Sequence, residues 1–206
     1  MYVPPHFAET EISRLHEFME QNSFALVTSR TADSLAASHL PLLLERDAGP
    51  HGRLVGHFAR ANPHWRDAAG EALVVFSGPH AYVSPTWYET ENVVPTWNYV
   101  AVHAYGTLQL IDEQDELIEV LQRTVSLYES AMPAPWSFDA NSDFIRKLAA
   151  MVVGFRIDIT RLDGKWKLNQ NHPQERREKV IRVLSERHDE NSQAIAELMR
   201  ETRSSS

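Results

Sequence analysis

The chain has 206 residues, a net charge of −8 and no cysteine. This length fits one large domain or a domain with an appendage, and the missing cysteines exclude disulfides and thiolate metal sites. The negative charge argues against nucleic acid or anionic membranes as partners of the whole surface. No apolar run approaches the roughly 20 residues of a membrane span, and the first residues lack signal-peptide features, so we expect a cytoplasmic protein.

The first predicted elements are an amphipathic helix over residues 10–21 and an antiparallel strand pair, Phe24–Ser29 with Leu35–Glu45. Proline cannot donate to a sheet ladder, so the second strand should be interrupted near Pro41. The interruption leaves backbone groups free at Ser38, His39, Leu40 and Pro41. An edge strand and a ligand site both explain such a pattern, and both readings stay open.

A strand over Arg53–Ala59 leads into a favourable helix start, with Asn62 as N-cap and Pro63 as first helical residue. We expect a short helix that ends near Gly70. Its unpaired amides, together with Arg60, would make a phosphate site on local physics alone. The alternative is that Arg60 pairs with an acid elsewhere.

Strands are predicted next over residues 72–78, over a short segment ended by Pro85, and over 98–111, where Gly106 is a candidate bulge. The segment TENVVPTW before the last of these strands is expected to be a loop that closes over something. The longer stretch that contains this loop, Leu54–Leu108, is rich in histidine, tryptophan and tyrosine. Such side chains line small-molecule sites, although an aromatic-rich barrel core would look similar.

The C-terminal part is predicted to start with a helix capped by Asp112 and a second helix over Phe144–Met151. A strand from residue 153 should turn back at Asp163–Gly164, because Asp-Gly is a hairpin signal. In the short return strand, Lys165 and Lys167 share one face. The last thirty residues are expected to form one or two helices.

These elements predict a mainly β fold, a small barrel with peripheral helices. We expect a barrel domain over residues 1–173 and a helical extension with a disordered tail over 174–206. The sequence holds no GxGxxG, P-loop, HExxH or GxSxG motif, so classical dinucleotide sites and hydrolase chemistry gain no support. No metal ligands and no catalytic acid or base are assigned.

Six segments in collinear order carry a family resemblance: MYVPPHF, SHLPLLL, GHFARANPHW, FSGPHAYVSPTWY, VPTWNYVAVHAYG and KWKLNQN. Together they resemble the PaiB-like FMN-binding negative transcriptional regulators. The resemblance implies a split β-barrel of the FMN-binding, pyridoxamine phosphate oxidase-like type. It also implies a homodimer with FMN held between the subunits.

The resemblance gives the candidate residues roles toward FMN. Arg60 with Ala61 and Asn62 would hold the phosphate, and Lys165 or Lys167 would add a cation. The strand from Ser38 to Pro41 would run along the isoalloxazine ring. The remaining candidates, which would wall the ring or offer polar groups, are His57, Trp65, Trp97, Asn98, Tyr99 and Gln170.

Three functions stay open at this point. The first is a flavin protein with a redox or sensing role, including an FMN-dependent oxidoreductase. The second is a DNA-binding repressor, which the family name implies, although the basic residues after position 173 are matched by acids. The third is haem binding or haem degradation, which split-barrel relatives carry out.

Overall fold

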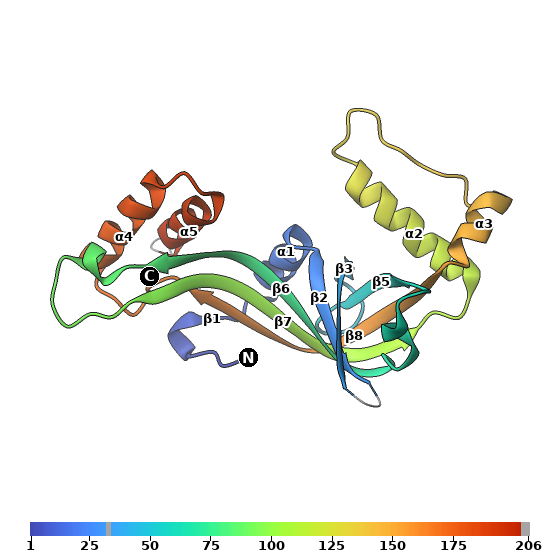
Figure 1. Ribbon diagram of the computed structural model, residues 1–206, viewed down its shortest axis with the longest axis horizontal. Helices are drawn as coiled ribbons and strands as arrows, with labels where there is room; N and C mark the ends of the chain where they lie inside the picture. Colours follow the sequence, from blue (N-terminus) through green and yellow to red (C-terminus); the bar gives the residue numbers. More distant parts are fainter. Residues whose placement is uncertain (32–33, 203–206) are drawn as a thin grey trace. The chain divides into compact units, whose positions relative to one another are not determined.

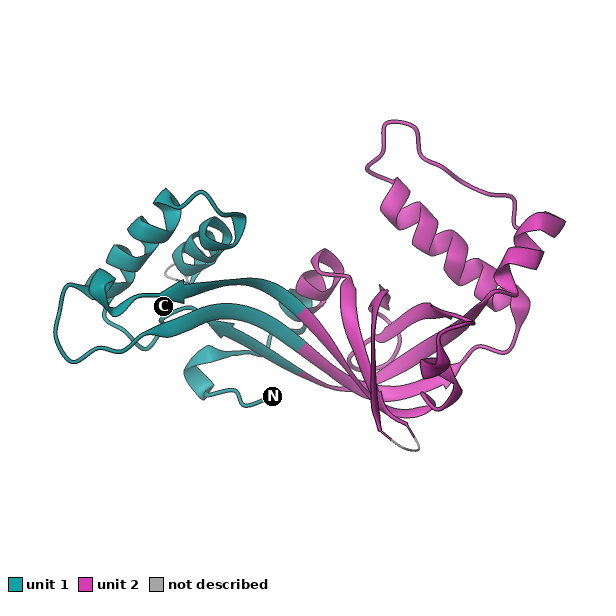
Figure 2. Ribbon diagram, in the orientation of Figure 1, with its two compact units in different colours: residues 1–15, 77–102, 163–206 teal, residues 16–76, 103–162 magenta. Residues whose placement is uncertain are grey.

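The computed structural model describes residues 1–31 and 34–202, so the predicted disordered tail, Ser204–Ser206, lies outside the described residues. The chain divides into two compact units (Figure 2). Unit 1 comprises residues 1–15, 77–102 and 163–206, and unit 2 comprises residues 16–76 and 103–162. Unit 2 is mainly β with peripheral helices, whereas unit 1 combines strand segments with the two C-terminal helices (Figure 1).

The described residues form an eight-stranded sheet with the hydrogen-bonded order β3-β2-β6-β7-β8-β5-β4, and β1 pairs with β8. The strands are β1 (Ala8–Glu9), β2 (Phe24–Arg30), β3 (Leu35–Pro41), β4 (Leu43–Glu45), β5 (Arg53–Ala59), β6 (Gly70–Val83), β7 (Thr96–Leu110) and β8 (Val152–Lys167). The helices are α1 (Ile12–Gln21), α2 (Gln114–Glu129), α3 (Asp143–Ala149), α4 (Gln174–Glu186) and α5 (Glu190–Glu201). Three 3-10 turns are η1 (Pro5–Phe7), η2 (Pro63–Arg66) and η3 (Pro85–Tyr88).

Part of the core of unit 2 lies between the sheet and helix α2, which stands between β7 and β8 in the chain. Phe58 of β5 and Phe155 of β8 are fully buried, with ring centroids 4.6 Å apart. Helix α2 buries Leu117 and Ile118 against this sheet, in a cluster that includes Val55 of β5. Apolar residues at helical spacing on α2 therefore face apolar residues at strand spacing, as the sequence pattern requires.

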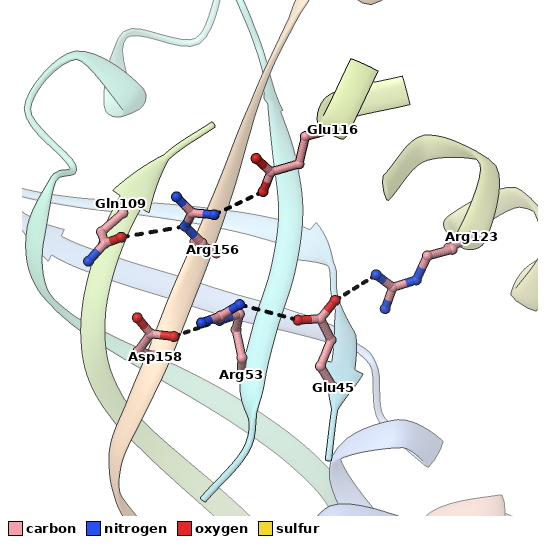
Figure 3. A network of polar contacts seen from close by, with 7 residues as sticks. All are labelled: Glu45, Arg53, Gln109, Glu116, Arg123, Arg156 and Asp158. Atoms are coloured by element: carbon pink, nitrogen blue, oxygen red, sulfur yellow. Dashed lines mark hydrogen bonds and ion pairs between the residues drawn. The ribbon is translucent and has the colours of Figure 1, made fainter. Parts of the chain in front are cut away.

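An ion-pair network lies at the junction of this sheet with α2 (Figure 3). Arg53 Nε of β5 lies 2.6 Å from Asp158 Oδ1 of β8, and Arg53 also approaches Glu45 of β4. Arg123 Nη1 of α2 lies 2.5 Å from Glu45 Oε1. A second arm joins α2 nearer its N-terminus, where Arg156 pairs with Glu116 at 3.0 Å. The network ties α2 to three strands of unit 2.

In unit 1, helices α4 and α5 pack side by side at the end of the chain (Figure 1). Their apolar positions are buried, including Leu184 of α4 together with Ile195 and Met199 of α5. Arg177 Nη2 of α4 donates to the Met199 carbonyl at 3.1 Å. The prediction of two C-terminal helices is confirmed, whereas the expected boundary between a domain ending at 173 and an extension stays a prediction.

Most predicted strands and helices are confirmed, including the β2–β3 pair, whose register places Ser38 opposite Val27. The predicted hairpin at Asp163–Gly164 is wrong, because β8 runs through both residues without turning. The predicted separate strand ending at Pro85 is also wrong, since β6 continues through Gly78 and Pro79. Helix α2 starts after Glu113 rather than after Asp112, and its N-cap makes no side-chain hydrogen bond.

Candidate functional site

The predicted N-cap at Asn62 is confirmed, but the helix that follows it is shorter than expected. Asn62 Oδ1 accepts a hydrogen bond from the His64 amide at 3.0 Å. The helical segment is the four-residue 3-10 turn η2, not a helix reaching Gly70. One of its first amides is already satisfied by the cap, so the expected row of free helix amides is absent from this turn.

His64 is the centre of a hydrogen-bond network in unit 2. Its Nε2 lies 2.9 Å from Ser29 Oγ of β2, and its Nδ1 lies 2.8 Å from Ser38 Oγ of β3. Asn62 Nδ2 donates to the same Ser38 oxygen at 2.9 Å. The network binds η2 to two strands and leaves Ser38 fixed at the edge of the sheet.

Burial lowers the pKa of His64, whose side chain is only 4% exposed. The neutral ring donates from one nitrogen and accepts at the other, so each serine hydroxyl has a defined role. Both side-chain partners of His64 among the described residues are serine hydroxyls and neither is a carboxylate, so the arrangement orients groups and does not resemble an activated nucleophile. Sequence reasoning missed this histidine as a site residue, although it stands inside the quoted segment GHFARANPHW.

Arg60 donates to backbone carbonyl groups. The sequence predicted either a phosphate contact or a pair with an acidic side chain, and not this arrangement. Its Nε donates to the Ala150 carbonyl at 2.6 Å and its Nη2 donates to the Val152 carbonyl at 2.9 Å. Its guanidinium lies 5.8 Å from the Trp65 ring, and Trp65 Nε1 donates to the Arg60 carbonyl at 2.9 Å. A guanidinium has five N–H donors, so donors remain for a ligand anion on an exposed, pre-oriented side chain.

The predicted interruption of the second strand is confirmed. Strand β3 ends at Pro41, the amide of Leu42 donates to the Ser23 carbonyl at 2.9 Å, and β4 begins at Leu43. Strand β3 stands at one end of the strand order, so one side of Ser38–Pro41 is a free edge. The edge-strand reading is therefore confirmed, and the ligand reading stays a prediction.

His57 of β5 carries a buried, unsatisfied polar atom. Its Nδ1 has no hydrogen-bond partner among the described residues, and burial lowers the pKa of its ring. It precedes Arg60 by three residues on the same segment. A buried donor or acceptor without a partner is costly, and a ligand polar group is one way to satisfy it.

An apolar groove of about 540 Å³ opens on the β2, β3 and β6 side of unit 2, in the size range of small-molecule sites. Its lining is formed by Thr28, Ser29, Arg30, Leu35, Ala36, Ala37, Glu71, Ala72, Leu73 and Tyr105. Ser29 belongs both to this lining and to the His64 network. Predictions from sequence did not include the groove, because its lining comes from strands that are far apart along the chain.

The predicted lysines lie in unit 1, on the last residues of β8. Lys167 Nζ donates to Thr96 Oγ1 and, at 2.6 Å, to the Trp97 carbonyl of β7. Burial, with the neighbouring charge of Lys165, lowers the pKa of Lys167. Lys165 is 7% exposed, donates to the Tyr2 carbonyl at 3.0 Å and lies 5.2 Å from the Tyr99 ring centroid.

A hollow of about 290 Å³ opens beside Lys167 within unit 1. It is lined by Phe7, Asn92, Val93, Val94, Thr96, Lys167, Asn169, Asn171, His172 and Arg176. Four of these residues come from the predicted TENVVPTW loop. Burial, followed by the charges of Arg176 and Lys167, lowers the pKa of His172. Predictions missed His172 and Arg176, which directly follow the quoted segment KWKLNQN.

The two predicted amides of unit 1 differ in how the protein satisfies them: Gln170 is bonded at both ends, whereas the buried Asn98 Oδ1 has no hydrogen-bond partner among the described residues. Gln170 accepts from the Leu168 amide at 2.7 Å and donates to the Trp166 carbonyl at 2.6 Å. Asn98 is fully buried, with its Nδ2 3.5 Å from Met199 Sδ. The predicted residues thus form one group in each unit: Ser38 to Trp65 in unit 2 and Trp97 to Gln170 in unit 1.

Residues 1–161 match the model of the family described as "Putative FMN-binding domain". The chain belongs to this family. FMN is therefore its cofactor class, and the resemblance to PaiB-like FMN-binding proteins is confirmed. "Protease synthase and sporulation protein PAI 2" of Bacillus subtilis (strain 168) is 38% identical over 202 residues, covering 97% of this chain and 96% of that relative.

Two solved structures share the fold with this FMN-binding family member. The flavocytochrome Anf3 from Azotobacter vinelandii has a TM-score of 0.61 at 12% identity, covering 80% of this chain and 72% of the other. The FAD and heme binding protein from Mycobacterium smegmatis has a TM-score of 0.59 at 18% identity, with coverages of 78% and 73%. With the observed strand order, they confirm the predicted split-barrel class of the pyridoxamine phosphate oxidase-like type.

Proposed function

We propose that the protein is a homodimer that binds FMN through unit 2 and uses the flavin in electron transfer or in sensing a redox state. The observation that carries the proposal is the family match, which covers every candidate residue from Ser38 to Trp65. When bound, FMN supplies one- and two-electron chemistry that no protein side chain offers. The chain's own residues bind and orient it.

The residues of unit 2 fit such a group in chemistry. Arg60 offers an oriented guanidinium to a phosphate, which its donor geometry matches. The free edge of Ser38–Pro41 offers backbone donors and acceptors to a polar ring edge, and the His64 network holds that edge in place. The unsatisfied His57 Nδ1 marks a further polar position in the same unit.

The proposed phosphate contact is tested by titrating flavin-free protein with FMN and following flavin fluorescence. We expect Arg60→Ala to weaken FMN binding at least tenfold, because a charge-assisted contact is lost. Arg66→Ala is the matched control, since Arg66 is exposed on the same turn η2. Unfolding midpoints of both variants separate a loss of contact from a loss of fold. Unchanged FMN affinity in a folded Arg60→Ala protein would refute this assignment.

The homodimer is the second part of the proposal, and it is supported by the family resemblance and by the open groove of unit 2. Leu35, on the free edge of β3, is 76% exposed and lines that groove. A second copy would cover exposed apolar surface of this kind. Light scattering coupled to size-exclusion chromatography should give about twice the 23.5 kDa chain mass; a 23.5 kDa species with full FMN binding would count against the dimer.

We assign neither direct DNA binding nor a catalytic residue. The basic side chains near α4 and α5 are matched by acids: Lys179 Nζ lies 3.0 Å from Glu89 Oε2, and Arg187 Nε lies 3.1 Å from Asp189 Oδ2. These pairs reduce the positive potential that phosphate backbones require. No helix in the described part of the chain has the length and apolar run needed to cross a bilayer. A cytoplasmic location stays a proposal that rests on the missing cysteines.

A further inference from the structure

The hollow beside Lys167 in unit 1 carries positive charge without a lining acid. Its charged lining residues are Lys167 and Arg176, and the lining also includes His172. No aspartate or glutamate belongs to the lining, although the whole chain has eight more acidic than basic residues. In such a chain, two cations gathered at one hollow favour an anionic ligand.

Two acidic side chains near α4 contact a cation outside the hollow. Lys179 Nζ lies 3.0 Å from Glu89 Oε2 and 3.3 Å from Glu175 Oε1. Glu89 is also approached by Arg182, at 3.7 Å. These contacts pair both carboxylates with side chains that do not line the hollow. Glu89 is the C-cap of η3, directly before the loop that lines the hollow, and has a left-handed conformation with φ 50°.

The polar walls of the hollow are rigidly positioned. Asn169 is 2% exposed, has a φ of 62° and donates from Nδ2 to the Tyr88 hydroxyl at 2.9 Å. The His172 ring stacks on Tyr88, with centroids 5.0 Å apart and an interplanar angle of 20°. Tyr88 itself is 1% exposed, so one buried ring orients two lining residues. Non-glycine residues in this backbone region are uncommon and persist where the surrounding structure imposes them.

The ammonium group of Lys167 is also held in place by hydrogen bonds within the protein. Two of the three donors of its ammonium group are directed at Thr96 Oγ1 and at the Trp97 carbonyl. The third remains for a ligand. The lining also has apolar members, Phe7, Val93 and Val94, which offer contact surface that an inorganic ion would not use. At about 290 Å³ the hollow is close to the lower end of small-molecule sites.

We propose that this hollow is a binding site for a small organic phosphate monoester, separate from the flavin. Lys167 and Arg176 would bind the phosphate through charge-assisted hydrogen bonds, and the apolar lining would contact the organic part. A dianion is favoured over a carboxylate because two cationic side chains line the same hollow. The hollow lies within unit 1, and five of its ten lining residues lie beyond the matched residues 1–161. Its separation from the flavin rests on the proposed function, which assigns FMN to residues Ser38 to Trp65 of unit 2.

The test uses phenyl phosphate as the probe and FMN-saturated protein as the sample. Calorimetric titration at constant ionic strength should show binding of phenyl phosphate that exceeds that of benzoate and of inorganic phosphate. We expect Lys167→Met and Arg176→Met each to weaken it at least tenfold. Arg182→Met is the matched control, because Arg182 lies on the same helix α4 but does not line the hollow; its affinity should stay within twofold of the unaltered protein.

Three results would overturn the proposal. The first is that FMN-saturated protein binds no phenyl phosphate. The second is that Arg182→Met loses as much affinity as Arg176→Met, which would show a diffuse electrostatic effect. The third is that only flavin-free protein binds the probe and Lys167→Met also abolishes FMN binding, which would make the hollow part of the flavin site. Because Arg176 and Lys167 lie on different elements, a folding defect in one variant leaves the other informative.

Discussion

Ser38 Oγ and His64 Nδ1 lie 2.8 Å apart, so a side chain on the edge strand β3 is bound directly to the turn η2 that follows Arg60. This hydrogen bond connects the two segments of unit 2 that we assign to FMN. It also gives the edge strand a side-chain partner in addition to its ladder with β2.

The Ser38–His64 contact predicts a coupled loss of stability and flavin affinity. Ser38→Ala leaves Asn62 Nδ2 and His64 Nδ1 without their shared oxygen, which we expect to cost about 1–2 kcal/mol in the free energy of unfolding. FMN affinity should fall as well. Urea unfolding and FMN titration measure the two effects. Ser126→Ala, on an exposed position of α2, should change neither by a comparable amount.

Histidine burial predicts that stability declines on acidification. Burial lowers the folded-state pKa of His57 and of His64 below the unfolded value of about 6.5. The unfolded state then binds more protons between the folded pKa and pH 6.5, so stability is retained above about pH 6.5 and lost as the pH falls toward the folded pKa. Urea midpoints of flavin-free protein from pH 7.5 to 5 measure this slope.

His57→Gln should flatten that pH dependence, because it removes one of the groups that must stay neutral in the folded protein. His188→Gln, on an exposed residue between α4 and α5, is the control and should leave the slope unchanged. Parallel slopes for His57→Gln and the unaltered protein would contradict the assigned role of burial.

Gly106 predicts a steric requirement on β7. A Cβ at this position would meet the Asp158 carbonyl oxygen and lie 2.7 Å from Ile157 Cγ2, both on β8. Gly106→Ala should therefore cost about 3 kcal/mol or more, since backbone atoms cannot move aside cheaply. Thr107→Ala, at the exposed neighbouring position, should cost under about 1 kcal/mol. Equal unfolding midpoints for the two variants would show that the strands adjust.

The ion-pair network of Figure 3 predicts a modest, salt-dependent contribution to stability. Arg53→Met removes contacts with Asp158 and Glu45, and because these groups are partly exposed we expect a loss of about 1 kcal/mol at low salt. The difference from the unaltered protein should shrink in 1 M NaCl, where the screening length is about 3 Å. A loss that does not change with salt would point to packing rather than charge.

Local sequence signals predicted much of the fold, and the exceptions have physical reasons. The Asp163–Gly164 pair signals a hairpin, yet both residues lie in the continuous strand β8. Position 164 requires glycine for a different reason, because a Cβ there would meet Leu15 and, at 2.8 Å, the Glu9 carbonyl. Glycine provides space for β1 at this position, not a turn. Two separate strands are predicted on either side of Pro79, but β6 is continuous there. It pairs with β2 only over Ala72–Val75, so Pro79 removes no donor from that ladder.

The candidate site was predictable where it depended on adjacent residues. Asn62 and Pro63 predicted a capped helix start, and Pro41 predicted an interruption of the second strand. The cap and the interruption are confirmed, although the helix itself is only the turn η2. The His64 network joins residues 26 and 35 positions apart, and the Arg60 guanidinium binds carbonyls about 90 positions away. Sequence spacing contains no signal for such contacts. The hollow of unit 1 was likewise hidden, because its lining comes from three separate stretches of the chain.

The visible absorption spectrum of the purified protein, with mass identification of any released cofactor, tests the central claim most directly. We predict a flavin spectrum with FMN as the released molecule, or its appearance at one FMN per chain after reconstitution and removal of free FMN. A protein that stays colourless after FMN addition, or that shows a Soret band and binds haem in place of flavin, would contradict the account.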